Sequence, residues 1–260
     1  MTDKKLPDIQ SLSDERNIAL DRAGVKGLRW PITVMDRRHG KQTTVATVNL
    51  YVNLPHNFRG THMSRFVEVL NEYRDTEWID RTGEILEKIR TSLEADEAHM
   101  EVEFPYFIEK KAPVSGQPSL MSYDCRFFAS YQNGEDFILS VSVPVLTMCP
   151  CSKEISDYGA HNQRCTVTVQ VRYNDFVWIE ELIELAESSA SGDLYSILKR
   201  PDEKYVTEHA YDNPMFVEDV VREVAHKLNE MDRITWYIVE ADSQESIHNH
   251  NAYASVEKKK

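Results

Sequence analysis

The predicted order of strands and helices runs twice along the chain, and this repetition constrains the fold more than any other feature. Period-two alternation of apolar and polar residues predicts strands, and apolar residues spaced three and four apart predict amphipathic helices. In the first half these patterns predict a ββααββ order over residues 25–35, 41–53, 61–73, 83–98, 100–104 and 121–127. Thr61 is the predicted N-cap of the first helix.

The second half repeats the architecture without residue-level identity to the first. Strands are predicted at 136–146, 164–173, 233–241 and 251–256, with helices at 176–189, 193–199 and 214–231. Residues 200–212 read as an irregular insertion. The last helix is predicted to begin with Asn213 as N-cap and Pro214 as its first residue, and a valine-rich stripe marks its buried face.

These elements predict an α+β fold with two tandem modules, at residues 18–133 and 134–260, after a loose polar arm at 1–17. In each module an antiparallel sheet carries its helices on one face. Such a sheet has unprotected edge strands, and self-association into closed barrels would pair them. The sequence therefore predicts an oligomer.

Composition excludes several classes of partner. With 43 acidic and 30 basic residues the formal charge is −13, which argues against nucleic acids and anionic membrane surfaces as partners. No apolar run is long enough to span a membrane, and four cysteines are too few for a disulfide scaffold of this size. No apolar signal region follows the first residues, so we expect a cytoplasmic protein.

Three of the four cysteines fall between positions 147 and 165, and this cluster predicts chemistry. A metal site, a nucleophile and a redox pair are all compatible with it. A single Cys-Pro-Cys without a second pair disfavours a structural zinc finger, whereas mixed ligands from distant loops favour a catalytic metal. Cys165 alternates with valines, and it and Cys125 are predicted to be core residues. The candidate ligands are Cys149, Cys151, His161, Glu203, His248 and His250.

Each further candidate has two interpretations. Glu203 is a solvated loop carboxylate or a ligand, and the two late histidines form a surface turn or a ligand pair. Glu218 makes an exposed salt bridge four residues along the helix, or it accepts two N–H bonds from a guanine-like edge. Anion-binding candidates surround the start of the first helix and the cysteine cluster, at Arg59, His62, Arg65, Ser152 and Lys153.

Four segments together resemble the type IB GTP cyclohydrolase I enzymes. They are TMCPCSK at 147–153, GTHMSRF at 60–66, NPMFVED at 213–219 and ESIHNH at 245–250. The resemblance covers nearly the whole chain. It implies the tunnelling fold with two modules per subunit, and a homotetramer whose active sites lie between subunits.

The resemblance also implies the reaction, in which GTP and water give 7,8-dihydroneopterin triphosphate and formate as the first step of tetrahydrofolate biosynthesis. It implies a site for zinc, manganese or iron. Carried over by position, Cys149, His161, Glu203 and His248 are the metal-site residues, with Cys149, His161 and His248 as catalytic residues. The predicted substrate-binding residues are Glu218, His62, Arg65, Ser152 and Lys153.

Three alternatives remain at this point. An archaeal-type relative makes a cyclic phosphate from GTP. The nitrile reductase branch of the fold uses a cysteine nucleophile and NADPH, and the presence of Glu203 and His161 at ligand positions counts against it. A metal- or redox-sensing protein without turnover would use Cys149 and Cys151, but it has no reason to carry Glu218.

Overall fold

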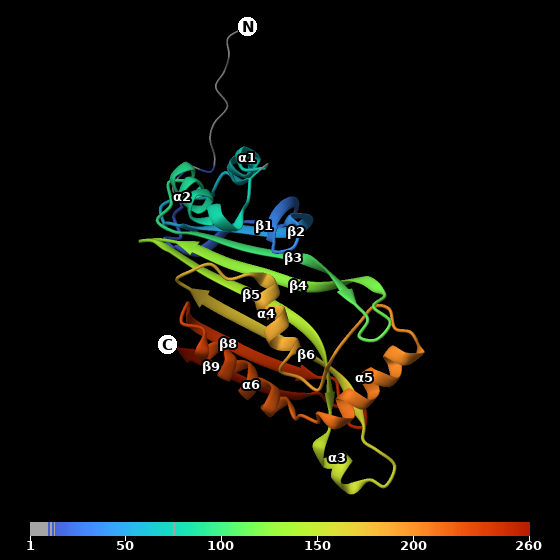
Figure 1. Ribbon diagram of the computed structural model, residues 1–260. Helices are drawn as coiled ribbons and strands as arrows, with labels where there is room; N and C mark the ends of the chain where they lie inside the picture. The colour runs from blue at the N-terminus through green and yellow to red at the C-terminus, as the bar shows by residue number, and fades with distance from the viewer. Residues whose placement is uncertain (1–9, 11, 13, 75) are drawn as a thin grey trace. The chain divides into compact units, whose positions relative to one another are not determined.

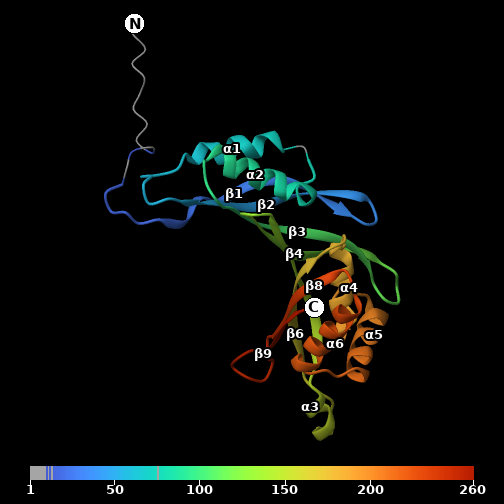
Figure 2. The same ribbon diagram turned by 90° about the vertical axis from the view of Figure 1, so that its left-hand side faces the viewer.

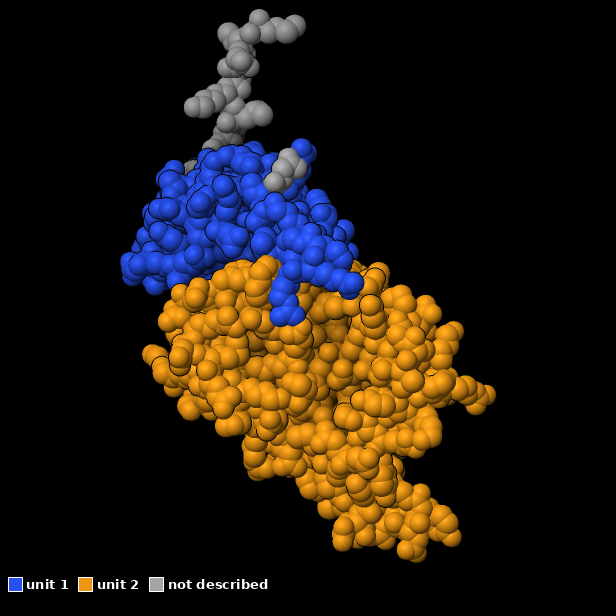
Figure 3. Space-filling model, in the orientation of Figure 1, with its two compact units in different colours: residues 1–104, 126–137 blue, residues 105–125, 138–260 orange. Residues whose placement is uncertain are grey.

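The computed structural model describes residues 10, 12, 14–74 and 76–260, and it divides into two compact units. One unit comprises residues 1–104 and 126–137, and the other comprises residues 105–125 and 138–260 (Figure 3). Three long strands contribute residues to both units. The predicted module boundaries stay a prediction, and most of the predicted arm, residues 1–9, 11 and 13, lies outside the described residues.

The first unit is an antiparallel sheet with two helices on one face. Its strands follow the order β1 to β4, and its helices lie together over β1 and β2 (Figures 1 and 2). The prediction of an early hairpin is confirmed, and both strands are longer than predicted. The elements are β1 (Leu20–Asp36), β2 (Gly40–Leu54), α1 (Met63–Glu72), η1 (Ile79–Arg81), α2 (Thr82–Ser92), β3 (Ala98–Lys111) and β4 (Pro118–Tyr131).

The second unit is also an antiparallel sheet with helices on one face, and it has more helices than the first. Its strands follow the order β3, β4, β5, β6, β8 and β9, and β7 pairs with β5. Helices α4 and α6 lie on one face of the sheet, and α3 lies beyond the ends of β5 and β6 (Figures 1 and 2). The elements are β5 (Glu135–Met148), α3 (Pro150–Ile155), β6 (Asn162–Tyr173), α4 (Ile179–Glu187), β7 (Gly192–Asp193), α5 (Arg200–Asp212), α6 (Val217–Glu230), β8 (Ile234–Ser243) and β9 (Ala252–Lys259).

The core of the second unit confirms the predicted faces. Along β6 the alternating side chains from Cys165 to Val171 are 0–1% exposed, and the valine stripe of α6 is buried as well. Burial raises the pKa of the Cys165 thiol to about 12 and that of Cys125 well above its usual value, so both are inert core residues as predicted. The α+β class is confirmed.

The segment before α6 differs from the prediction. Residues 193–199 are not helical, and the stretch 200–212 that we expected to be irregular is α5. The helix start explains this: Asp202, at the third helical position, accepts the backbone N–H of the N-cap residue Lys199, and Pro201 suits the first turn because no N–H is needed there. The sequence of α5 has no periodic apolar stripe that would predict a helix, because the helix buries only Asp202 and Ala210.

Two predicted helix caps are also wrong. Helix α6 begins at Val217 with Phe216 as N-cap, because the preceding residues are held elsewhere: Asn213 Nδ2 donates to Ala190 O at 2.9 Å. Helix α1 begins at Met63 with His62 at the N-cap position and no side-chain cap, whereas Thr61 is buried. In the part of the chain that the structure describes, no helix has the length and apolar character needed to cross a bilayer.

Candidate active site

Cys149 and His161 are brought together where β5 ends and β6 is about to begin. The backbone N–H of Cys149 donates to the carbonyl of His161 at 3.1 Å. The hydroxyl of Ser152 links the same two residues, because it donates to Cys149 O at 3.1 Å and accepts the N–H of His161 at 3.2 Å. The N–H of Ser152 also donates to Cys149 Sγ at 3.4 Å. The loop is therefore closed by its own hydrogen bonds, and both candidate ligands are at its base.

The imidazole of His161 has a fixed orientation. Its Nδ1 lies 2.9 Å from Oε1 of Gln163, which is buried, and 3.3 Å from Oγ of Ser246. An amide oxygen can only accept, so this contact suits the tautomer of the neutral imidazole that has its proton on Nδ1 and its lone pair on Nε2. That tautomer suits Nε2 for binding a metal ion or receiving a proton. Gln163 was missed by the sequence analysis, although its position two residues after His161 in a strand was the available signal.

His248 and His250 lie in the loop between β8 and β9, and both are exposed. Their rings stack, with centroids 5.2 Å apart and planes inclined by 17°. Ser246 of the same loop contacts His161, so this loop begins beside the Cys149 and His161 pair. A further hydrogen bond, from Gln244 N to Arg164 O at 2.8 Å, fixes where the loop leaves the sheet.

Glu203 lies apart from these residues. It is exposed in the first turn of α5, whereas the last turn of that helix contacts α3: Lys153 Nζ donates to the carbonyl of Tyr211 and lies 4.3 Å from its ring centroid. Eight residues of helix separate Glu203 from Tyr211, about 12 Å along the axis. Among residues 10, 12, 14–74 and 76–260, no group of three or more His, Cys, Asp or Glu side chains gathers closely enough to hold a metal ion.

Glu218 is exposed in the first turn of α6, near the loop that carries Cys149 and His161. The segment leading into α6 is tied to the end of β5, because Met215 N donates to Met148 O at 3.0 Å, one residue before Cys149. Arg222 pairs with Asp219 at 3.1 Å and not with Glu218, so the salt-bridge interpretation of Glu218 is wrong. Within the described part of the chain, no ion pair engages the Glu218 carboxylate.

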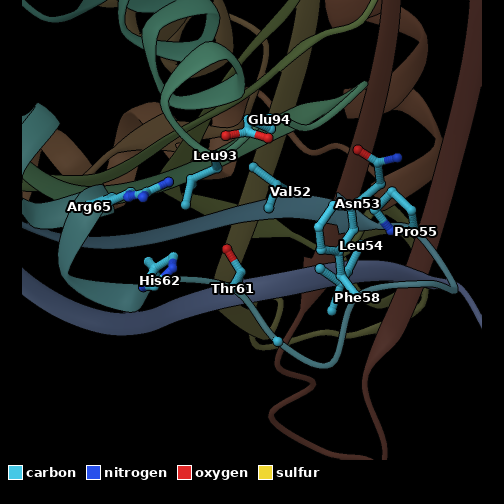
Figure 4. Close-up of a pocket in the computed structure, with 11 residues that line it drawn as sticks. Val52, Asn53, Leu54, Pro55, Phe58, Thr61, His62, Arg65, Leu93 and Glu94 are labelled. Carbon is cyan, nitrogen blue, oxygen red and sulfur yellow. The ribbon is translucent and has the colours of Figure 1, made fainter. Parts of the chain in front are cut away.

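His62 and Arg65 line a pocket of the first unit, at the start of α1 (Figure 4). Arg65 Nη1 donates to the carbonyl of Ser92 at 2.8 Å, which fixes the guanidinium at the pocket wall. The N–H groups beside Arg59, which an anion at this helix start would use, are occupied. Arg59 N donates to Leu12 O at 2.9 Å, and Gly60 N donates to Gln10 O at 3.1 Å. Anion binding by His62 and Arg65 stays a prediction that rests on their side chains.

The comparisons with known proteins show the family to which this chain belongs. Residues 6–254 match the model of the family described as type I GTP cyclohydrolase folE2. A protein of Syntrophus aciditrophicus (strain SB) named GTP cyclohydrolase FolE2 is 60% identical over 252 residues, which covers 96% of this chain and 99% of that protein. The protein of the same name from Geotalea uraniireducens (strain Rf4) is 56% identical over 255 residues, 98% of this chain and 94% of that one.

Solved structures show the fold alone. A highly active mutant of Bacillus sp. TB-90 urate oxidase superposes with a TM-score of 0.56 at 8% sequence identity, covering 93% of this chain and all of that one. A uricase from Bacillus fastidious gives a TM-score of 0.55 at 7% identity, covering 92% and 94%. The chain is thus a tunnelling-fold protein. It belongs to the type I GTP cyclohydrolase folE2 family, and the predicted resemblance to the type IB enzymes is confirmed.

Proposed function

We propose that this chain is a GTP cyclohydrolase I, which converts GTP and water to 7,8-dihydroneopterin triphosphate and formate in the first step of tetrahydrofolate biosynthesis. The observation that carries the proposal is the family match over residues 6–254, together with relatives of that activity at 55–60% identity over nearly the full length. The cytoplasm remains the expected compartment.

The family indicates a divalent metal ion, and the donors present fit one in kind. A thiolate, imidazoles and a carboxylate are ligands that zinc, manganese and iron all accept. We propose Cys149, His161, Glu203 and His248 as the metal-site positions. A divalent ion supplies Lewis acidity that activates a water molecule near neutral pH.

The chain's own residues account for binding and for proton movement. Glu218 presents two carboxylate oxygens, which match two neighbouring N–H groups on the edge of guanine. His62, Arg65, Ser152 and Lys153 are the proposed triphosphate contacts. The attack of water at C8 of the purine and the loss of that carbon as formate require proton transfer at the nitrogens of the purine's five-membered ring. A histidine is a suitable proton carrier at neutral pH.

The two histidines divide these roles according to how firmly each is held. His161 is held by contacts with Gln163 and Ser246, which suits a permanent ligand. His248 is exposed, and its ring stacks on that of His250. We therefore expect His161→Ala to lose bound metal. His248→Ala should keep most of its metal and lose about 10²–10⁴-fold in kcat. Metal content by mass spectrometry beside formate release measures both; equal metal loss in the two variants would contradict the division.

We propose further that a second copy of the chain completes the site. Among the described residues Glu203 does not group with the Cys149 and His161 pair, although the resemblance to the type IB enzymes implies that all three hold one ion. A homotetramer would bring the first turn of α5 from one copy to the loop of another.

Subunit mixing tests this arrangement. Cys149→Ala and Glu203→Gln variants should each be inactive, yet when they are unfolded together and refolded as mixed oligomers about one quarter of the sites regain both native residues. Formate release should rise from background toward about that fraction of the wild-type rate. Mixed oligomers that stay inactive, with mixing verified by mass spectrometry, would place both ligands in one chain.

The archaeal-type alternative is separated by its product. Chromatography of the reaction mixture should show a pterin that becomes fluorescent on oxidation and retains a linear triphosphate. A cyclic phosphate product instead would show that the chain has the archaeal-type activity.

A further inference from the structure

Residues 194–199 join β7 to α5, and polar contacts hold this part of the chain against β3 and β4. Just before it, Asp193 pairs with Lys110 Nζ at 3.0 Å, and the same ammonium lies 4.5 Å from the ring centroid of Tyr195. Ser196 Oγ donates to the carbonyl of Leu120 at 2.7 Å. All of these residues belong to the second unit. The chain that leads into α5 is therefore fixed to two strands that are distant in sequence.

The strongest contact of this kind is made by Asp202 in the first turn of α5. Its side chain is fully buried, at 0% exposed, and one oxygen accepts the backbone N–H groups of Val114 and Ser115, both at 2.8 Å. The other oxygen accepts the Ser115 hydroxyl at 2.7 Å and the N–H of Lys199 at 2.8 Å.

A helix cap requires only the last of these four bonds. The other three come from the turn that joins β3 to β4, nearly ninety residues earlier in the chain. Charge-assisted bonds to a buried carboxylate are directional and costly to break, so they fix the first turn of α5 against that turn in both position and rotation. Successive helical residues point about 100° apart, and Glu203 next to Asp202 is directed outward and exposed.

We propose that Asp202 and Ser115 form a positioning pair for the Glu203 carboxylate, holding it where it serves the metal site. This inference rests on the proposed ligand role of Glu203. An exposed glutamate has many rotamers and its helix carries little buried apolar surface, so the precision of the ligand has to come from the backbone that bears it.

The test uses the full-length, metal-free protein titrated with Mn²⁺ alone and monitored by electron paramagnetic resonance. Ser115→Ala removes one donor and leaves the backbone bonds, and Asp202→Asn removes the charge. We expect both to weaken Mn²⁺ binding about tenfold, as found for groups that orient metal ligands. Ser115→Thr, which keeps the hydroxyl, should restore binding. Glu208→Gln makes the same carboxylate-to-amide change on the exposed face of α5 and should bind as the wild type does.

Glu203→Gln distinguishes the ligand role of Glu203 from the positioning role of Asp202 and Ser115. If it loses Mn²⁺ binding while Asp202→Asn and Ser115→Ala bind normally, the positioning role is overturned and the ligand assignment stands. If Glu203→Gln itself binds Mn²⁺ normally, Glu203 is not a ligand and both fall. Should Asp202→Asn fail to fold, Ser115→Ala decides alone, because that exposed turn residue keeps its backbone N–H bond to Asp202.

Discussion

Replacing Cys149 with alanine is expected to abolish formate release from GTP and to leave the fold and the proposed oligomer intact. The side chain is half-buried at the N-cap of the short helix α3, and the hydrogen bonds that close its loop run through backbone groups and Ser152. Alanine keeps every one of these except the weak N–H contact to sulfur. What the variant loses is the only thiolate donor of the proposed ligand set, and bound metal should fall with activity.

Cys151→Ala is the matched control. Cys151 lies two residues away on the same helix and is exposed, so its removal deletes a thiol without touching the closed loop. We expect activity and metal content close to those of the wild type. Full activity in Cys149→Ala would remove the metal hypothesis, and equal loss in both variants would indicate a thiol pair as the active group.

Glu218→Gln should lower kcat/KM for GTP by about a hundredfold or more. The amide keeps one acceptor oxygen and replaces the other with a donor, so one charge-assisted bond to guanine is lost and two donors face each other. Each bond to a charged acceptor contributes roughly 1.5–3 kcal/mol, which supports a loss of this size. Steady-state kinetics with GTP measures it.

The control for this variant is Arg222→Ala on the same helix. Arg222 pairs with Asp219 on the surface, and an exposed pair of this kind contributes less than about 1 kcal/mol. Its kcat/KM should match that of the wild type. A Glu218→Gln enzyme that also keeps its kcat/KM for GTP would leave the guanine without its proposed anchor.

Strands and buried faces were predictable from the sequence because burial follows a short, regular period. The alternation that placed Cys165 with three valines predicted both the strand and its buried face, and the valine stripe of α6 did the same for a helix. Both elements bury their apolar face, so local pattern and tertiary environment agree.

Helix α5 was missed because its stability does not come from a local pattern. It buries one carboxylate and one alanine, and the carboxylate is held by a turn that lies far away in sequence. The start of α6 was misplaced for a related reason: Asn213 has the chemistry of an N-cap, but its amide bonds to Ala190 instead. Side chains that bond across the fold override the local preference of the same residues.

The candidate site was predictable in part. The clustering of Cys149, Ser152 and His161 in sequence carried over to contact in space, because a short loop closes on itself. Gln163, which orients His161, drew no attention because a glutamine in a strand looks like an ordinary polar position. The separation of Glu203 from the other candidates depends on the path of α5, which no local motif reveals.

The most direct test of the proposed function is to incubate the purified full-length protein with GTP after loading it separately with zinc, manganese or iron. We predict that at least one loaded form releases formate in equal amount to a pterin triphosphate that becomes fluorescent on oxidation. If none of the three forms yields either product from GTP, the assignment of this chain as a GTP cyclohydrolase I is wrong.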